Sequence, residues 1–323
     1  MDTLVVQNAH SLLSSNSSLS YITLTPSFFL HQVRFSTLPN HKPITRTRIR
    51  SALKFSMSLS AKNPGFEQQR LIIPNKHGEK LVGILHDSGN KEIVILCHGF
   101  RSSKESNTIV NLAAALEKAG ISSFRFDFSG NGESDGSFQY GHYWREADDL
   151  YAVTQHFHES NRLVTAILGH SKGGGVVLLY ASKYHDVKAV VNLSGRYDLK
   201  AGVEERLGQD YMERIREDGF IDVKRPGSSS EYRVTLESLL DRLNTNMHEA
   251  CLQIDKECRV LTVHGSSDTV ISVEDASEFA KIIPNHRLHI IEGADHSYTN
   301  HQDELASQVV NFIKETFHQD KDT

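Results

Sequence analysis

The sequence predicts an α/β protein in which one mostly parallel, doubly wound sheet of eight strands carries a single inserted cap. From Arg70 onward, short apolar runs alternate with longer helical patterns, as in strands joined by crossover helices. This alternation is interrupted once, by residues 196–258, where connections in α/β folds are usually far shorter. We interpret this segment as a cap inserted into one core and not as a separate domain.

The elements follow from this pattern in chain order. Strand candidates are the short apolar runs, and helix candidates are the longer stretches with apolar residues three or four apart. The first helix candidate ends at Gly120, a residue type that commonly ends helices. The strand candidates are residues 71–73, 81–85, 93–97, 122–126, 163–168, 187–193, 260–263 and 288–291. The helix candidates are residues 107–119, 144–158, 174–184 and 302–317, with cap helices expected at 201–217 and 236–252 around a short extended part at 233–235.

Composition divides the 323 residues into two parts. Residues 1–66 hold seven basic residues and one acid, whereas residues 67–323 hold 28 basic and 39 acidic residues, a net charge of −11. The second part is long enough for one α/β core. Its charge disfavours nucleic acid or an anionic membrane surface as the main partner, and no apolar run is long enough for a transmembrane helix.

Residues 1–66 have the composition of a transit peptide. The first 60 residues hold 12 Ser and 6 Thr, and no Lys or Arg precedes Arg34. A secretory signal would need a continuous apolar core, and a mitochondrial presequence would need early arginines. We therefore expect import into the plastid stroma of a chloroplast. The alternative is a disordered extension on a cytoplasmic protein.

The sequence contains three cysteines, Cys97, Cys251 and Cys258. This number is small and odd, which argues against a framework of disulfide bonds. They favour a reducing compartment, with Cys97 as a small buried residue.

The motif with the clearest chemistry is Gly169 to Gly173, which matches G-x-S-x-G where a strand should give way to a helix. Small residues permit the strained turn that exposes a serine hydroxyl above the sheet. We therefore predict Ser171 as a nucleophile, against the alternative of a chance glycine-rich turn.

A serine hydroxyl needs a base, and the motif predicts an acid and then a histidine further along the chain. Asp268 follows the strand candidate 260–263, and His296 follows the candidate 288–291. Asp295 is a poor alternative because side chains of neighbouring residues point apart. His286, His289 and His301 are weaker candidates for the base, since they lie beside or in a strand or at a helix start.

The tetrahedral intermediate of such a reaction needs two backbone donors, one after the nucleophile and one after the third strand. The amides of Lys172 and Phe100 are predicted for this oxyanion hole. Only the N–H of Lys172 is required, which leaves its side chain free to point into solvent.

These motifs, with the loop at residues 98–100 and the run R-F-D-F-S-G-N-G-E-S-D-G at 125–136, resemble the α/β-hydrolase superfamily. The resemblance is closest to serine aminopeptidase-like and monoacylglycerol lipase-like hydrolases, especially cinnamoyl (feruloyl) esterases of bacterial type. It covers residues 68–318 and implies the α/β-hydrolase fold with serine hydrolase activity. Lys172 stands where this esterase group usually has glutamine, and Asn131 stands where histidine is usual.

No cofactor and no metal are predicted. The glycines at 130, 132 and 136 do not complete a phosphate-binding loop. Four histidines could gather at one sheet edge and suggest zinc, but metal-binding spacing is missing. These are His98, His170, His264 and His296.

The leading function is therefore a cofactor-free serine hydrolase that cleaves small carboxylic esters through an acyl-enzyme, with hydroxycinnamoyl-type esters as the expected substrates. The alternatives are a monoacylglycerol or acyl lipase, an acyltransferase, a peptide hydrolase, and a non-catalytic ligand receptor of the same fold. The sequence does not predict the oligomeric state.

Aromatic residues of the cap and core loops could form the walls of an acyl pocket, or could simply pack the cap onto the core. These are Phe100, Phe128, Tyr197, Tyr211, Phe220 and Tyr232. The charged run at 200–206 is expected to be a solvated helix face, with contact to substrate as the alternative.

Overall fold

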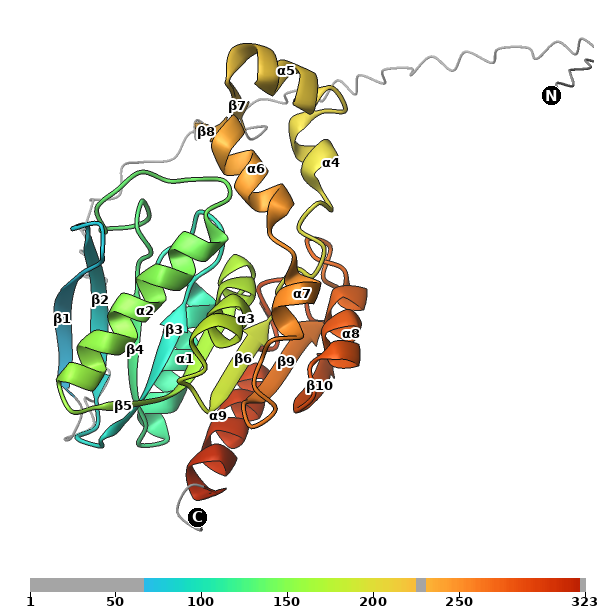
Figure 1. Ribbon diagram of the computed structural model, residues 1–323. Helices are drawn as coiled ribbons and strands as arrows, with labels where there is room; N and C mark the ends of the chain where they lie inside the picture. The colour runs from blue at the N-terminus through green and yellow to red at the C-terminus, as the bar shows by residue number, and fades with distance from the viewer. Residues whose placement is uncertain (1–66, 225–230, 320–323) are drawn as a thin grey trace, which may run out of the picture. The chain divides into compact units, whose positions relative to one another are not determined.

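The computed structural model describes residues 67–224 and 231–319 (Figure 1). The predicted transit peptide, residues 1–66, lies outside the described residues and stays a prediction.

The core is one eight-stranded sheet with the strand order β1-β2-β4-β3-β5-β6-β9-β10 (Figure 1). Strand β1 pairs antiparallel with β2, and β2 pairs antiparallel with β4, whereas the other neighbouring pairs are parallel. The predicted sheet is thereby confirmed. The strands are β1 Glu67–Pro74, β2 Lys80–Asp87, β3 Glu92–Cys97, β4 Ser122–Phe126, β5 Leu163–His170, β6 Ala189–Leu193, β9 Arg259–Gly265 and β10 His286–Ile291.

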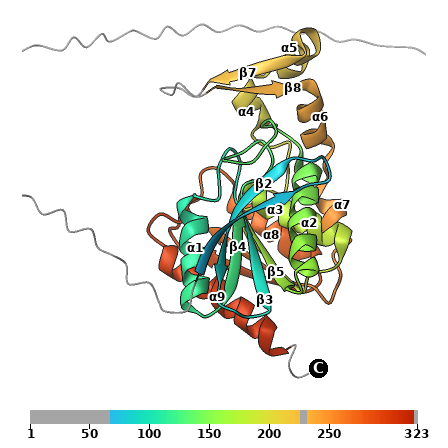
Figure 2. The same ribbon diagram turned by 90° about the vertical axis from the view of Figure 1, so that its left-hand side faces the viewer.

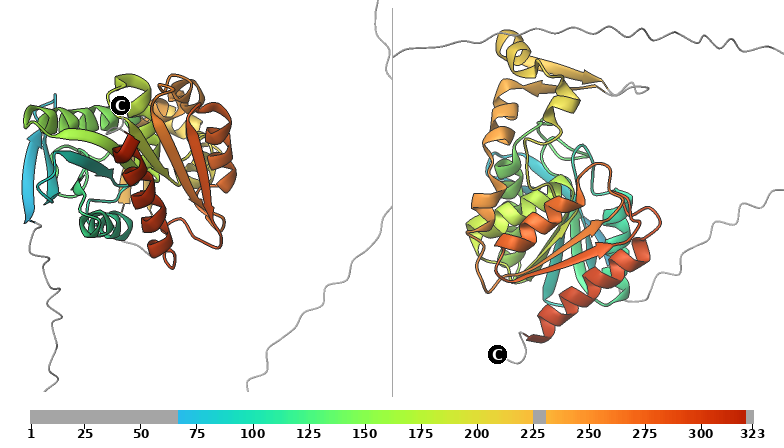
Figure 3. Two further views of the ribbon diagram at one scale, coloured as in Figure 1. Left: turned by 90° about the horizontal axis from the view of Figure 1, so that it is seen from below. Right: turned by 90° about the vertical axis from the view of Figure 1, so that its right-hand side faces the viewer.

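Helices cover both faces of this sheet (Figure 3). On one face, α1 (Asn107–Lys118) and α9 (Gln302–Gln319) bury Leu112 and Phe312 against the strands. On the other face, α2 (Tyr143–Glu159), α3 (Lys172–Tyr184) and α8 (Val273–Ile282) pack on a second apolar cluster. The strands between them are buried on both sides, which is why they read as continuous apolar runs in the sequence.

The cap rises from the end of the sheet at which the parallel strands terminate (Figure 2). It has its own small core, which includes Tyr140, Ile215 and Leu239. After it, α7 (Met247–Cys251) returns the chain to the face of α3 and α8. The cap elements are α4 Val203–Leu207, α5 Tyr211–Asp218, β7 Phe220–Lys224, β8 Glu231–Thr235 and α6 Leu236–Asn244.

Two expectations for this region were wrong. The stretch 201–217 is two helices because Gly208, at a φ of 94°, ends the first of them. The stretch 236–252 is also two helices, because Thr245 is extended and the side chain of Asn246 accepts a hydrogen bond that begins α7. The sequence analysis also missed β7, which pairs antiparallel with β8, and helix α8.

Candidate active site

Ser171 lies in a strained turn between β5 and α3, with φ of 58° and ψ of −117°. The flanking glycines allow this turn. A Cβ atom on Gly169 would lie 2.0 Å from the carbonyl oxygen of Gly173, and one on Gly173 would lie 2.5 Å from the carbonyl oxygen of His98. The G-x-S-x-G pattern is therefore a packing requirement, and it leaves the serine partly exposed at the sheet edge.

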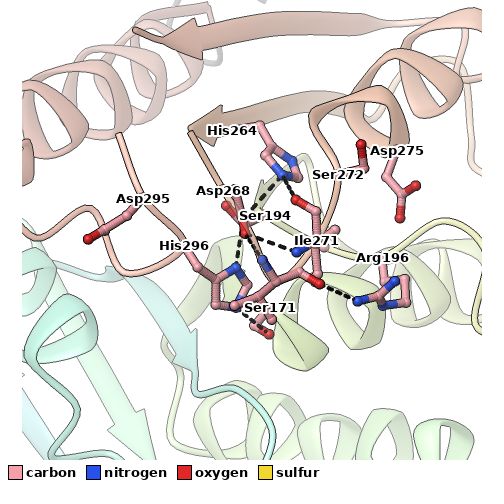
Figure 4. A network of polar contacts seen from close by, with 12 residues as sticks. Ser171, Ser194, Arg196, His264, Asp268, Ile271, Ser272, Asp275, Asp295 and His296 are labelled. Carbon is pink, nitrogen blue, oxygen red and sulfur yellow. Dashed lines mark hydrogen bonds and ion pairs between the residues drawn. The ribbon is translucent and has the colours of Figure 1, made fainter. Parts of the chain in front are cut away.

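The structure brings together Ser171, His296 and Asp268, the three residues predicted as nucleophile, base and acid (Figure 4). His296 Nε2 lies 3.0 Å from Ser171 Oγ, and His296 Nδ1 lies 2.7 Å from Asp268 Oδ2. The geometry favours a tautomer in which Nδ1–H donates to the carboxylate and Nε2 accepts from the hydroxyl. A base and a group that orients it are thus within reach of the serine.

Asp268 is held by more than its contact with His296. Its side chain is fully buried, and Oδ1 accepts the backbone N–H groups of Val270 and Ile271. His264 Nε2 lies 3.3 Å from Oδ2 and 3.0 Å from the Ile271 carbonyl oxygen. Although burial opposes it, bonding to His264, His296 and the Ile271 amide holds the Asp268 pKa well below its usual range. The carboxylate therefore stays ionised at neutral pH.

The rejected alternatives lie elsewhere. Asp295 accepts the backbone N–H groups of Ser297 and Thr299, and its side chain points away from His296 (Figure 4). It stabilises its own turn and does not orient His296. His286 contacts Thr262 Oγ1, and His289 faces Glu304.

His170 is a neighbour of the triad that the sequence analysis did not assign. Its ring centroid lies 5.0 Å from that of His296, and its Nε2–H donates to the His296 carbonyl oxygen at 2.8 Å. Burial, and then the charge of His296, lower the pKa of His170 to about 4, so the ring is neutral at pH 7. His170 therefore fixes the loop that carries His296.

Two backbone N–H groups next to Ser171 are available to an oxyanion. Within the described residues, neither Phe100 N–H nor Lys172 N–H has a hydrogen-bond partner. The carbonyl of Gly99 accepts from His98 Nδ1 at 2.8 Å and from Ser102 N–H at 3.3 Å. Because a trans peptide directs its C=O and N–H in opposite directions, the Phe100 N–H points away from His98. A Cβ on Gly99 would lie 3.0 Å from Ser171 Cβ, which places this peptide against the serine.

The Lys172 side chain does not point into solvent. Its ammonium group is buried, donating to the Gly141 carbonyl oxygen and to Glu146 Oε1, each at 2.6 Å. Burial raises the pKa of Glu146 to about 7, against the opposing effect of Lys172. The residue after the nucleophile is thus anchored to the start of α2, because a buried ammonium needs a partner.

Most of the aromatic residues that were considered either as pocket walls or as packing residues serve packing. Phe128 is fully buried in the core beside His98. Tyr197 packs on Phe279, and Phe220 lies under the guanidinium of Arg233 on the cap surface. Tyr211 is part of the cap cluster. A cavity of about 220 Å³ is lined by Phe100 and Tyr232 together with charged residues.

Within residues 67–224 and 231–319, no group of three or more His, Cys, Asp or Glu side chains is arranged to hold a metal ion. Over the same ranges, no helix combines the length and apolar character needed to cross a membrane. The three cysteines are buried thiols.

Comparisons with known proteins agree with this architecture. A protein-family model described as serine aminopeptidase, S33, matches residues 88–224. The ferulic-acid-bound structure of Est1E from Butyrivibrio proteoclasticus is similar with a TM-score of 0.66 and 24% identity, over 77% of this chain and 99% of that chain. The chain has the α/β-hydrolase fold.

Two further solved structures are similar to this chain in fold. A putative hydrolase from Agrobacterium vitis S4 has a TM-score of 0.62 at 19% identity, over 78% of this chain and 98% of that chain. The esterase Pf2001 from Pyrococcus furiosus has a TM-score of 0.59 at 22% identity, over 77% of this chain and 93% of that chain. No curated protein matches the sequence. The family match contains Ser171 but ends before Asp268 and His296, so their pairing rests on the distances in this chain.

Proposed function

We propose that the protein is a cofactor-free serine hydrolase that cleaves small carboxylic esters through an acyl-enzyme. The observation that carries the proposal is the continuous hydrogen-bonded chain from Ser171 through His296 to Asp268. Beside it are two backbone N–H groups that have no hydrogen-bond partner among the described residues. A non-catalytic receptor would not require this combination of strained serine, base and oxyanion donors.

The reaction follows from these positions. Ser171 Oγ attacks the ester carbonyl carbon while His296 Nε2 takes the hydroxyl proton, and the Phe100 and Lys172 N–H groups stabilise the resulting oxyanion. Collapse of this intermediate breaks the bond to the alcohol oxygen, which receives the proton from His296. Water then attacks the acyl-enzyme by the same route, releasing the carboxylic acid and restoring the serine.

We propose hydroxycinnamate-type esters as preferred substrates. The similar Est1E structure contains ferulic acid, and in this chain Phe100 and Tyr232 line a cavity beside the loop that supplies the Phe100 amide. Stacking of a flat acyl group on such rings could contribute about 0.5 to 1.5 kcal/mol for each pair of rings. Long-chain acylglycerols would not gain this contribution.

Fluorophosphonate labelling, with the adduct mapped by mass spectrometry, tests the chemistry directly. We expect modification of Ser171, no labelling or ester cleavage by Ser171→Ala, and unchanged circular dichroism of that variant. Full activity of Ser171→Ala would refute the mechanism.

A substrate panel tests the specificity. Values of kcat/KM for short hydroxycinnamate esters should exceed those for long-chain monoacylglycerols. The opposite ranking would contradict the preference for hydroxycinnamate esters and would indicate a lipase. Addition of an acceptor alcohol should leave the free acid as the main product, whereas a transferase would form a new ester.

We propose that residues 1–66 direct the protein to the plastid stroma, on the basis of their Ser- and Thr-rich, acid-poor composition. A fluorescent reporter fused behind these residues should enter chloroplasts of plant cells. A reporter that stays in the cytoplasm would defeat this assignment and would leave the proposed chemistry intact.

A further inference from the structure

A small pocket lies beside Phe100, whose backbone amide is a predicted oxyanion donor. It has a volume of about 220 Å³ and is formed by this loop together with the cap elements α4, β7 and β8. The ring centroids of Phe100 and Tyr232, on its wall, are 5.7 Å apart. Phe100 directly follows Gly99, which lies against Ser171, so one lining residue of the pocket is adjacent to the peptide beside the nucleophile.

The polar lining of this pocket is mainly cationic. Arg101, Arg206 and Lys224 contribute positive charges, and Glu205 contributes a negative one, while Lys224 also pairs with Glu231 at 3.6 Å. The guanidinium carbon of Arg206 lies 5.0 Å from the centroid of the Phe100 ring. A guanidinium over an aromatic ring keeps its N–H groups, which can bind a carboxylate or phosphate by paired hydrogen bonds.

Arg206 differs from Arg214 and Arg233 of the cap in its partners, whereas Arg216 likewise forms no ion pair with a carboxylate among the described residues. Arg214 and Arg233 are paired with Asp210 and Asp222, respectively. Arg206 is exposed and contacts aromatic rings, and it forms no ion pair with a carboxylate among the described residues. Residues 67–323 carry a net charge of −11. The absence of a carboxylate partner for Arg206 among the described residues is therefore not due to a general excess of positive charge in this part of the chain.

Further positive charges lie near Arg206. Its guanidinium and that of Arg242 lie 5.9 and 5.0 Å from the centroid of the Tyr140 ring, and the buried Tyr140 hydroxyl has no partner within the described residues. Burial, and then the charges of Arg242 and Arg206, lower the pKa of Arg196. Arg196 in turn donates to the carbonyl of Val270, in the loop that carries the triad acid (Figure 4). Cationic residues therefore occur both at the pocket and against the loop that carries the triad acid.

We propose that this pocket binds a negatively charged group of the substrate, so that the preferred esters carry a carboxylate or phosphate on their acyl or alcohol part. The inference rests on the proposed esterase function and adds the charge of its substrate. Arg206 supplies the main ligand of the anionic group, and Phe100 and Tyr232 contact the apolar part that joins this group to the ester.

The test compares anionic esters with neutral esters of nearly the same shape. For the acyl part, these are the 4-nitrophenyl monoester of suberic acid and its terminal primary amide. For the alcohol part, they are the butyrate esters of 4-hydroxyphenylacetate and 4-hydroxyphenylacetamide. In at least one pair, the wild-type protein should prefer the anionic ester by about fivefold in kcat/KM, as expected for one partly exposed ion pair. About 0.5 M NaCl should reduce this preference.

Arg206→Gln should remove most of the preference through a higher KM for the anionic ester, with less than about a twofold change for the neutral one. Arg206→Lys should retain part of it, because lysine keeps the charge without the planar pair of donors. Arg216→Gln, which removes an exposed arginine of α5, is the matched control and should leave the preference unchanged.

Equal rates on both members of each pair by the wild-type protein would overturn the anionic pocket and leave the esterase function intact. An equal loss of kcat/KM for both esters in Arg206→Gln would also overturn the anionic pocket, because it would show that Arg206 only packs against its neighbours. Absence of any ester cleavage together with absence of fluorophosphonate labelling would instead refute the proposed function itself.

Discussion

Among single residues, Asp268 and Asp295 provide a matched pair, since both are aspartates near His296 and only Asp268 contacts its ring. We expect Asp268→Asn to lower kcat by about 10³- to 10⁴-fold, because an amide would favour the wrong tautomer of His296. Asp295→Asn should change kcat by less than about threefold. Steady-state kinetics with a short ester measures both, and similar losses in the two variants would contradict the assignment of the acid.

His98 is a positioning residue whose effect should act through the Phe100 amide. Its Nδ1 donates to the Gly99 carbonyl, and its Nε2 accepts the Phe128 N–H at 3.1 Å. We expect His98→Ala to lower kcat by about 10- to 100-fold with little change in KM, because one oxyanion donor loses its orientation. His98→Asn retains a donor near the position of Nδ1 and should recover part of kcat. A loss confined to thermal stability would show that His98 only supports the core.

At the level of elements, the contact between the start of α2 and the cap helix α6 is unusually close. A Cβ on Gly141 would lie 2.0 Å from the Ser238 carbonyl oxygen, and the Gly141 carbonyl itself accepts from Lys172. Gly141→Ala should therefore push α6 away, lower the free energy of unfolding by about 1 to 3 kcal/mol, and reduce kcat/KM. Urea unfolding and ester kinetics measure the two effects.

The control for this prediction is Gly175→Ala in α3. A Cβ there would meet Tyr143 at 3.4 Å, an ordinary contact, and alanine is the better helix former. We expect unchanged or slightly higher stability and normal kinetics. Destabilisation by both substitutions would mean that the tight packing around Gly141 is not specific to the cap contact.

The elements differ in how well the sequence predicted them. Strands such as β3 were located to within one residue because buried parallel strands form short apolar runs bounded by polar residues. The cap helices were wrongly joined, because a break at Gly208 or Thr245 depends on backbone conformations that helical periodicity does not reveal. The pattern from 273 to 282 is amphipathic, and counting its apolar spacing could have located α8.

For the whole molecule, buried histidines predict a loss of stability in mild acid. The pKa values of His98, His170 and His286 are lowered to about 4, chiefly by burial. Between pH 6.5 and 4 the unfolded chain therefore binds more protons at these sites, and the free energy of unfolding falls as the pH falls. Glu146, with a pKa raised to about 7, acts in the opposite direction.

Summing these effects, we expect the free energy of unfolding to decrease by about 2 kcal/mol from pH 6 to pH 5. Urea unfolding at the two pH values measures it. His286→Gln, remote from the triad on β10, should weaken the pH dependence. A stability that is constant or rises over this interval would contradict the expectation that these histidines are buried in the neutral form.

The sequence by itself determined the order of the eight strands along the chain, the position of the nucleophile and the chain order of acid and base. These are local properties: apolar periodicity, glycine requirements at a strained turn, and the placement of polar residues after strands. Only the tertiary structure decided that Lys172 turns inward to Glu146, that His264 supports Asp268, and that the cap places cationic residues beside Phe100. The contact of Lys172 with Glu146 and that of the cap with Phe100 join separate elements, and the contact of His264 with Asp268 depends on the conformation of the loop after β9. Packing and the need to pair buried charges orient these side chains, and no single segment of the sequence encodes that orientation.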